Sequence, residues 1–284
     1  MDGIIIINKP KGCTSHDIVH KAKKIFNEKV GHTGTLDPMA TGVLPLLIGK
    51  GTLCSKYLIE HDKIYKAKIQ LGIKTDTADQ EGNIIEKLQV DDSIFNIEKI
   101  KNVLKNMIGK IEQTPPIYSA IKVKGKKLYE YARKGEKVEI PKRKITIYNI
   151  ELTNIDPKNK TIEFKVHCSK GTYIRSLCED ISAKLGTIGY MASLQRVKVG
   201  RFSIENSITI DDLENDIKDY FISIEKLFEN EPSIELNNRK LELFLNGVKL
   251  THELNDGVYK IYNNNKFIGL GTVKNNLLKR DVII

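Results

Sequence analysis

The order of strand-like and helix-like segments constrains this chain more than any other feature of its sequence. Ile4 to Ile7 form a continuous apolar run typical of a buried strand, whereas residues 65–71 alternate apolar and polar side chains, as a half-buried strand does. Helix-like segments fall between such strands at irregular intervals, with no G-x-G-x-x-G pattern and no regular βαβ spacing. We therefore expect an α+β fold of mixed order with a mainly antiparallel central sheet flanked by helices.

Helical periodicity and helix-end signals place the other elements. Thr14 and Asp17 have the spacing of a capping box, which predicts a helix to about Asn27. Apolar residues in helical phase predict helices over 97–108 and 175–185, each followed by a glycine. The remaining expected elements are strands at 145–152, 161–168, 258–262, 266–273 and 278–283 and a short helix at 239–246.

Two shifts in charge divide the chain. Of its 284 residues 40% are apolar, enough for a packed core, and the net charge is +10. Residues 121–147 hold ten Lys/Arg against three Glu, which indicates a polyanionic partner, although a nucleic acid, an acidic membrane surface and a merely solvated surface all fit the charge alone. Residues 205–231 hold nine Asp/Glu against two Lys. This shift predicts a domain boundary near Pro232, with domains at 1–231 and 232–284.

Several classes of protein are disfavoured by what the sequence lacks. The first apolar run is only four residues long, so it predicts neither a signal peptide nor a membrane span, and we expect a cytoplasmic protein with no membrane partner. The cysteines form no C-x-x-C pair, which predicts reduced and mostly buried thiols rather than a zinc ribbon or a disulfide framework. They are Cys13, Cys54, Cys168 and Cys178.

Two short patterns imitate metal and nucleotide sites. His16 and His20 have the spacing of the zinc-protease pattern H-E-x-x-H, but Asp17 replaces the glutamate and no third ligand is evident, so we expect a surface histidine pair and no metal site. Gly49-Lys50-Gly51-Thr52 resembles the end of a phosphate loop. The first glycine of that pattern is replaced by Leu44, so no ATP site is predicted.

A glycine-rich segment around one carboxylate is the most informative part of the chain. Residues 28–52 are expected to form a long loop, within which residues 31–42 read Gly-His-Thr-Gly-Thr-Leu-Asp-Pro-Met-Ala-Thr-Gly. Glycines let the backbone approach a ligand closely, and Pro38 disfavours a helical conformation at Asp37, so the carboxylate can be presented from a rigid loop. On residue types alone, an Asx turn at the surface is the simpler interpretation.

The same segment resembles the active-site signature of the TruB family of tRNA pseudouridine synthases. The similarity extends in unbroken order over about residues 3–203. It implies a pseudouridine-synthase fold followed by a small PUA-like RNA-binding module, and an enzyme that isomerises uridine 55 in the T-arm of tRNA without a cofactor. The other matching motifs are Asn8-Lys9-Pro10, Tyr65-x-Ala67, Leu71-Gly72, Thr75-Asp76-Thr77, Pro115-Pro116-x-Tyr118-Ser119-Ala120 and Gly171-Thr172-Tyr173-Ile174-Arg175.

By this resemblance, three residues would carry the reaction. Asp37 stands at the position of the family's essential carboxylate, the catalytic nucleophile, which must be ionised and within reach of the target uridine. Arg175 matches the arginine that pairs with this aspartate, and we expect it to lower the pKa of Asp37. Tyr65 matches the tyrosine that stacks on the target base, because unstacked RNA bases are held against aromatic faces. Taken singly, a surface arginine and a core tyrosine would be ordinary features of such a chain.

Further positions match the family's contacts to the substrate. His32 matches a histidine that helps to extrude the nucleotide from its loop, and Tyr173 and Leu194 fall where the family contacts the nucleoside. Leucine is common in protein cores, so Leu194 fits a core position equally well. The supporting residues that the resemblance implies are Lys9, Pro10 and Asp79.

The basic segment resembles an insertion of the family, at about residues 117–147, that closes over the RNA stem-loop. The resemblance implies tRNA as the partner, with no protein partner required and a monomeric enzyme. Two alternatives stay open: an RNA-guided rRNA pseudouridine synthase, which the basic insertion and small C-terminal part disfavour, and a catalytically silent RNA-binding protein. The route of the reaction stays open too, through attack at C1′, addition to the base or a glycal. The cations expected to contact RNA are Lys122, Lys124, Lys126, Lys127, Arg133 and Lys134.

Overall fold

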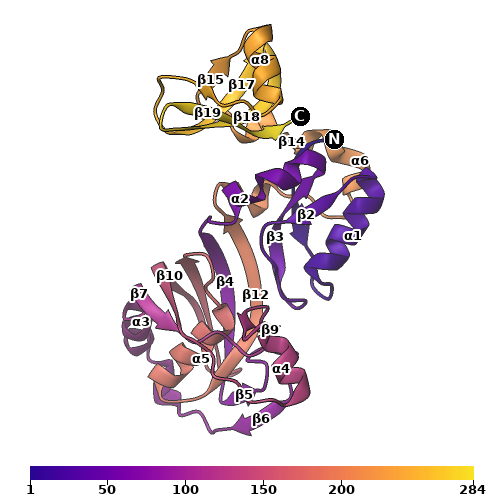
Figure 1. Ribbon diagram of the computed structural model, residues 1–284. Coiled ribbons are helices and arrows are strands. Elements are labelled where there is room, and N and C mark those ends of the chain that lie inside the picture. Colours follow the sequence, from indigo (N-terminus) through magenta and orange to yellow (C-terminus); the bar gives the residue numbers. More distant parts are fainter.

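Two β-sheets organise the protein. The computed structural model describes the backbone of residues 1–284 and all side chains except those of residues 214–216. A ten-stranded sheet belongs to the larger part of the molecule, and a five-stranded sheet forms a smaller C-terminal module (Figure 1). The mixed α/β architecture expected from the order of elements is confirmed.

The large sheet is antiparallel between all neighbouring strands except β3 and β12. Its order is β14-β1-β3-β12-β4-β11-β10-β7, with β2 paired to β3 and β13 paired to β12. The strands are β1 (Gly3–Lys9), β2 (Val30–His32), β3 (Thr41–Ile48), β4 (Lys63–Leu71), β7 (Gly109–Gln113), β10 (Arg143–Asp156), β11 (Thr161–Cys168), β12 (Gly189–Val199), β13 (Phe202–Ser203) and β14 (Ile222–Ser223).

Helices cover the two halves of this sheet separately. The predicted capping box opens α1, and Thr14 accepts a hydrogen bond from the Asp17 amide while Asp17 accepts one from Thr14. No helix among the described residues is long and apolar enough to cross a membrane. The helices are α1 (Ser15–Phe26), α2 (Ser55–Leu58), α3 (Ile97–Lys105), α4 (Leu128–Lys134), α5 (Ile174–Leu185), α6 (Leu213–Tyr220), α7 (Ile224–Leu227) and α8 (Asn238–Leu245).

Separate apolar clusters hold each half. Under α3 and α5, the fully buried side chains of Ile69, Phe164 and Leu177 belong to one core. Under α1, Ile7 and Leu44 belong to another. Each such side chain stabilises the fold by about 1.5–3 kcal/mol through burial, so both halves are firm platforms for what lies between them.

The large sheet divides at the junction of β3 and β12. These strands pair only at Gln195↔Thr41 and Arg196↔Gly42, after which they separate (Figure 1). Farther along β3, β2 pairs with the edge of β3 that β12 no longer occupies. The segment that joins β2 to β3, residues 33–40, is therefore placed at the opening between the two halves of the sheet.

The prediction that residues 28–52 form one long loop is wrong. They contain β2 and the almost completely buried β3. A strand buried on both faces reads as an apolar run instead of an alternating one, and Pro45 with the flanking glycines concealed it. Pro45 lies between the β12-paired and β2-paired stretches of β3, where its missing N–H is tolerated. A smaller difference is that α3 ends at Lys105, three residues before its predicted end.

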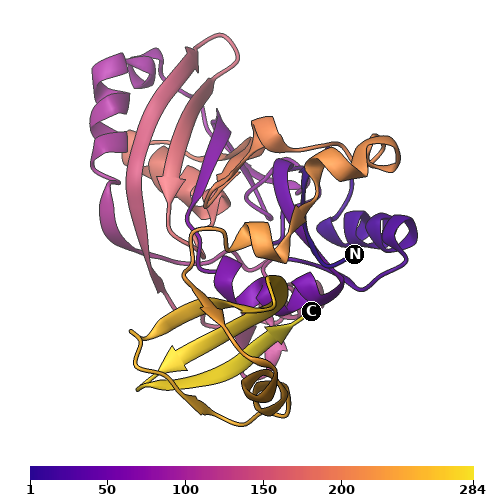
Figure 2. The ribbon, with the colours of Figure 1, turned by 90° about the horizontal axis from the view of Figure 1, so that it is seen from above.

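The C-terminal module has its own core and also packs on the large sheet. Its strand order is β15-β17-β18-β19-β16, and three of these strands match the predicted segments. Leu270 and Val282 join a cluster with Ile4 of β1, and Asp281 accepts hydrogen bonds from Lys56 and Tyr57. Figure 2 shows the module lying against this end of the molecule. The strands are β15 (Ser233–Glu235), β16 (Leu250–Thr251), β17 (Gly257–Asn263), β18 (Lys266–Lys274) and β19 (Leu277–Ile283), and the remaining hairpins are β5 (Ile73–Thr75) with β6 (Ile84–Lys87) and β8 (Lys122–Val123) with β9 (Lys126–Lys127).

Gly42 is where the fold tolerates no side chain. It has φ +103, and a Cβ there would lie 2.2 Å from the carbonyl oxygen of Arg196. We expect Gly42→Ala to lower the free energy of unfolding by roughly 3 kcal/mol, because backbone strain and overpacking add. Gly109→Ala is the matched control, since Gly109 has φ +115 with nothing within 4 Å of its Cβ position. Urea denaturation that gives equal losses for the two variants would show that the β3–β12 contact contributes nothing.

Candidate active site

Hydrogen bonds from the side chain of Lys9 support the loop that carries Asp37. This lysine is fully buried, and its Nζ donates to the carbonyl oxygens of Pro10 (2.9 Å), Cys13 (2.6 Å) and Pro38 (3.2 Å). Burial lowers the pKa of Lys9, with nearby anions including Asp37 opposing it. The predicted bracing role of Lys9 and Pro10 agrees with this geometry, in which Pro10 contributes its carbonyl.

Hydrogen bonds from α1 and the turn before it complete the support of the loop. Ser15 Oγ accepts from the Leu36 amide (2.9 Å) and lies 3.2 Å from the Leu36 carbonyl oxygen. The amide of Gly12 donates to the Pro38 carbonyl (2.9 Å). The amide of Ala40 donates to the Asp37 carbonyl (3.0 Å), which closes a turn directly after the aspartate. The backbone on both sides of Asp37 is thereby fixed.

Arg175 joins the Asp37 loop to the other half of the sheet. It is the second residue of α5 and only 6% exposed, and its Nε lies 3.1 Å from Asp37 Oδ2 while its Nη2 donates to Asp37 Oδ1 (3.3 Å). The same guanidinium donates to the carbonyls of Thr77 (3.2 Å) and Tyr118 (3.0 Å). The predicted Asp37–Arg175 pair therefore exists, in the two-point geometry that fixes a carboxylate's orientation.

Asp79 provides a second carboxylate beside the same cation. Its Oδ2 lies 3.7 Å from Arg175 Nη1, and its Oδ1 accepts from Thr77 Oγ1 (2.6 Å) and from the Glu81 amide (3.0 Å). Asp79 is 4% exposed, and it combines both interpretations, a supporting residue and a turn aspartate, because its Oδ1 closes a turn with Thr77 and Glu81 while its Oδ2 faces Arg175. Two carboxylates therefore share one buried guanidinium.

The pKa of Asp37 departs from the prediction. Burial is the largest influence and raises the pKa of Asp37, Arg175 opposes this, and the negative charge of Asp79 raises it further. The expected effect of Arg175 is present, because it lowers the pKa of Asp37, but desolvation, which the expectation left out, outweighs it and makes the net shift upward. Arg175 limits the rise, and it keeps the carboxylate oriented.

The predicted substrate-contacting residues come from different strands and from one helix start. Tyr65 in β4 is 8% exposed and Leu194 in β12 is likewise 8% exposed, and both belong to the core under α5. Tyr173 is the residue before α5 begins, and its backbone amide and carbonyl are both bound by the side-chain amide of Gln113 (2.8 and 3.0 Å). Tyr173 thus stands two residues from Arg175, on the same helix start.

His32 ends β2 at the entrance to the same loop. Its ring is half-buried, and Nδ1 accepts from the Gly34 amide (3.3 Å). Burial, followed by the nearby positive charge of Arg196, lowers the pKa of His32, so the neutral ring is favoured at neutral pH. A neutral planar ring suits contact with a base better than contact with a phosphate.

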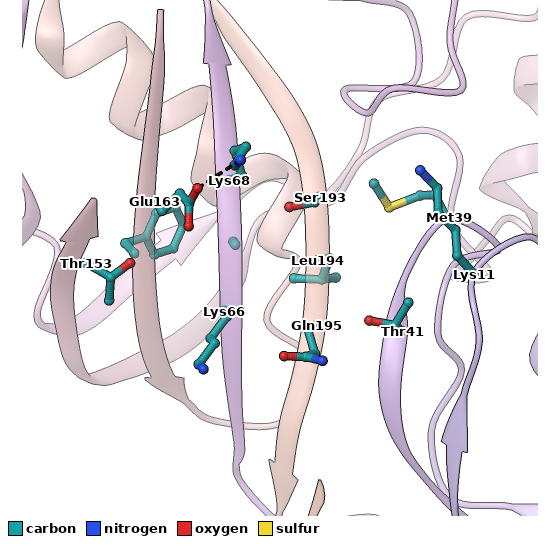
Figure 3. A pocket seen from close by; sticks show the side chains of 12 residues that line it. Lys11, Met39, Thr41, Lys66, Lys68, Thr153, Glu163, Ser193, Leu194 and Gln195 are labelled. Atoms are coloured by element: carbon teal, nitrogen blue, oxygen red, sulfur yellow. Dashed lines mark ion pairs between the residues drawn. The ribbon is translucent and has the colours of Figure 1, made fainter. Parts of the chain in front are cut away.

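A cavity of about 430 Å³ opens between β3 and the β4–β12 pair (Figure 3). Lys11 and Met39 lie on one side of it, and Leu194 points across it from β12. Lys68 is paired with Glu163 on its other wall (2.8 Å). Among the predicted site residues, only Leu194 lines this cavity, so the Asp37–Arg175 pair is not part of its wall.

The predicted RNA-binding cations lie on the β8–β9 hairpin and α4. Lys127 and Arg133 both lie over the ring of Tyr129, at 5.4 and 5.3 Å, and Lys126 lies over Tyr131 at 5.6 Å. Aromatic rings thus restrain three of these cations. All of the predicted cations are exposed except Lys127, which is half-buried. The contact of Tyr118 with Arg175 links the start of this insertion to the site. The exposed members are Lys122, Lys124, Lys126, Arg133 and Lys134.

Sequence reasoning missed two residues that shape the site. Gln113 holds the start of α5, as described above, and Arg196 is a buried cation of β12 that donates to the Gly34 carbonyl (3.0 Å). No local pattern marks Gln113 at the end of a strand. Arg196 follows Leu194 by two residues in a strand, so it shares that side chain's inward face, and this alternation was a usable signal.

A half-buried aspartate paired with an arginine, beside tyrosines at the split of a mixed sheet, fits the class of pseudouridine synthases. The sequence comparisons agree with that class. Residues 23–174 match the TruB family pseudouridylate synthase N-terminal domain, and residues 175–227 match the tRNA pseudouridylate synthase B C-terminal domain. The chain therefore belongs to the TruB family.

Close relatives cover almost the whole chain. Proteins described as tRNA pseudouridine synthase B from Clostridium kluyveri and Aquifex aeolicus are 45% and 41% identical to it, over 96% and 98% of both chains. A chain of an H/ACA RNP bound to a substrate RNA containing 2′-deoxyuridine superimposes with a TM-score of 0.70 at 25% identity, covering 99% of this chain and 85% of that one. A chain of a Cbf5–Nop10–Gar1 complex gives a TM-score of 0.68 at 28% identity, covering 95% and 78%.

The raised pKa of Asp37 predicts an acid limb in the activity. If Asp37 is the essential ionised carboxylate that the family resemblance implies, kcat/KM should fall as pH drops through a value above the ordinary aspartate pKa of about 4. Arg175→Gln should move this limb to still higher pH, because the cation that opposes the rise is removed. The control is Arg239→Gln, at an exposed position of α8, which should leave the limb in place. An acid limb that moves to lower pH in Arg175→Gln would contradict the assignment of this limb to Asp37.

Proposed function

We propose that this protein is a tRNA pseudouridine synthase that converts uridine 55 of the T-arm to pseudouridine. The observation that carries the proposal is the Asp37–Arg175 pair, held at the opening of the sheet in a chain of the TruB family. Relatives at 41–46% identity are described as tRNA pseudouridine synthases. An enzyme that acts on tRNA would work in the cytoplasm, and we propose that it acts as a monomer without a protein partner.

The reaction needs a base that has left its stack. The atoms that react, C1′, N1 and C5, are inaccessible while the uridine is stacked in its loop, so the nucleotide must be extruded. In the proposed complex, Tyr65 and Tyr173 hold the uracil, Leu194 bounds its pocket, and His32 fills space near the loop from which it came. These four side chains are buried or half-buried, which keeps much of the water out of the site.

Asp37 then serves as the catalytic nucleophile. It promotes cleavage of the bond between C1′ and N1, the freed uracil rotates, and C5 bonds to C1′ while the C5 proton is lost and N1 gains a proton. Atoms and electrons balance within the nucleotide, so no cofactor is needed. Arg175 keeps the carboxylate oriented toward the substrate, and Asp79 and the Thr77 carbonyl hold Arg175 in turn.

Domain roles follow from the same proposal. Residues 1–231 would form the catalytic domain, with the insertion at about 117–147 closing over the RNA stem-loop, and residues 232–284 would form a PUA-like RNA-binding module. The RNA-guided alternative is raised by the structural neighbour that is described as part of an H/ACA RNP bound to a substrate RNA. The stand-alone type is favoured because relatives of 45% and 46% identity, which match this chain almost end to end, are described as tRNA pseudouridine synthase B.

Replacing Asp37 separates catalysis from binding. Asp37→Asn should abolish turnover while tRNA affinity stays within a few fold, because the amide keeps the size of the side chain and loses the nucleophile. The measurement is tritium release from tRNA carrying 5-labelled uridine, with filter binding in parallel. The RNA control is the same tRNA with cytidine at position 55. Release by the variant, or loss of its binding, would contradict the role given to Asp37, and release by the wild type without guide RNA would exclude the guided type.

The basic insertion should govern the salt dependence of binding. Changing Lys122, Lys124, Lys126 and Lys127 together to glutamine should weaken tRNA binding and reduce the slope of log K against log salt by roughly one unit for each phosphate that these cations neutralise. A control with the same charge change uses exposed lysines on α3, well apart from α4 (Figure 1), and in the β10–β11 turn. An unchanged slope would place the RNA elsewhere. The control positions are Lys99, Lys101, Lys105 and Lys158.

A further inference from the structure

Arg196 is a buried cation for which the proposed reaction has so far given no role. It is only 2% exposed and is the largest side chain in the fully buried core. Among the side chains that the structure describes, no carboxylate lies within ion-pair distance of its guanidinium. Burying a charge without a counter-charge is costly, and a core apolar residue of similar volume would fill the same space without that cost. Arg196 is therefore expected to have a specific task.

The hydrogen bonds of Arg196 cross the split of the large sheet. From β12, its Nε donates to the carbonyl of Val43 in β3 (2.8 Å), and its Nη2 donates to the carbonyl of Gly34 (3.0 Å). Gly34 lies three residues before Asp37, in the segment that joins β2 to β3. The guanidinium of Arg196 therefore ties the loop that carries Asp37 to β12, the strand that also carries Leu194. Arg196 is itself one of the two residues of β12 that pair with β3.

Arg196 also faces Tyr65. The register of β12 on β4 sets Arg196 directly opposite Tyr65, and while burial raises the pKa of the Tyr65 hydroxyl, the nearby guanidinium opposes that rise. Both residues are buried, so the guanidinium limits the space in which the ring of Tyr65 can tilt. One side chain thus bonds to the Asp37 loop and lies opposite the tyrosine proposed to stack on the base.

We propose that Arg196 is a positioning residue, which sets the Asp37 loop and the Tyr65 ring at a fixed distance from each other for the extruded uridine. This role rests on the proposed function. Arg196 does not touch the substrate and acts through the Gly34 carbonyl and the Tyr65 hydroxyl. A displacement of either group by about 1 Å can lower a rate on the order of 100-fold without removing any reacting group.

The test compares variants of Arg196 with and without the Tyr65 hydroxyl, using tritium release from uridine-labelled tRNA. Arg196→Met should lower kcat on the order of 100-fold and leave KM within about threefold, and Arg196→Lys should recover about tenfold by keeping a donor. In a Tyr65→Phe background, Arg196→Met should cost markedly less, because the two changes remove one shared interaction. Thermal melting followed by circular dichroism establishes that each variant is folded.

The matched control is Arg201→Met. Arg201 likewise donates to backbone carbonyls, of Lys226 and Leu227, but lies outside the site, so its kcat should equal that of the wild type. If Arg196→Met does not fold, the positioning role is tested by the kcat of Arg196→Lys, measured alone and in the Tyr65→Phe background. A folded Arg196 variant with wild-type kcat, or effects that add fully with Tyr65→Phe, would overturn the positioning role. Absence of release by the wild type would instead refute the proposed function.

Discussion

The buried guanidinium of Arg175 is the group on which the arrangement of the site depends. It bonds to Asp37 from one half of the sheet and to the carbonyls of Thr77 and Tyr118 from the other, with Asp79 close by. Because this guanidinium is buried, its charge depends on these partners for compensation. The segments around Arg175 therefore hold one another in place, and the orientation of the Asp37 carboxylate is fixed before any substrate arrives.

The split of the sheet gives this pair its access to a ligand. If β3 and β12 paired along their full length, the strands would leave no opening, whereas pairing at only two positions leaves a wedge beside the Asp37 loop. The hydrogen bonds that Arg196 of β12 makes to Val43 and Gly34, on the other side of the wedge, tie the two sides together. An isomerisation requires little beyond a base held in place, an oriented carboxylate and limited access of water.

Sequence patterns predicted much of this architecture, and their failures have physical reasons. The capping box of α1 and the C-terminal strands follow local rules and were found in place. The contact of Asp37 with Arg175, 138 residues apart, came from family resemblance, because no local pattern encodes a long-range pair. Residues 28–52 were misread because a strand buried on both faces does not alternate. The lowering of the Asp37 pKa by Arg175 was predicted, but the larger rise from desolvation was not, because desolvation depends on the whole surrounding core, which the sequence does not show.

We propose that this chain, without a protein partner, isomerises one uridine in tRNA at the Asp37–Arg175 site. The most direct measurement incubates the purified protein with an unmodified tRNA transcript, without guide RNA or other proteins, and maps pseudouridine chemically along the whole transcript by carbodiimide modification and primer extension. A single new pseudouridine, at position 55, is expected. A transcript without pseudouridine, or one modified only at other positions, would contradict it.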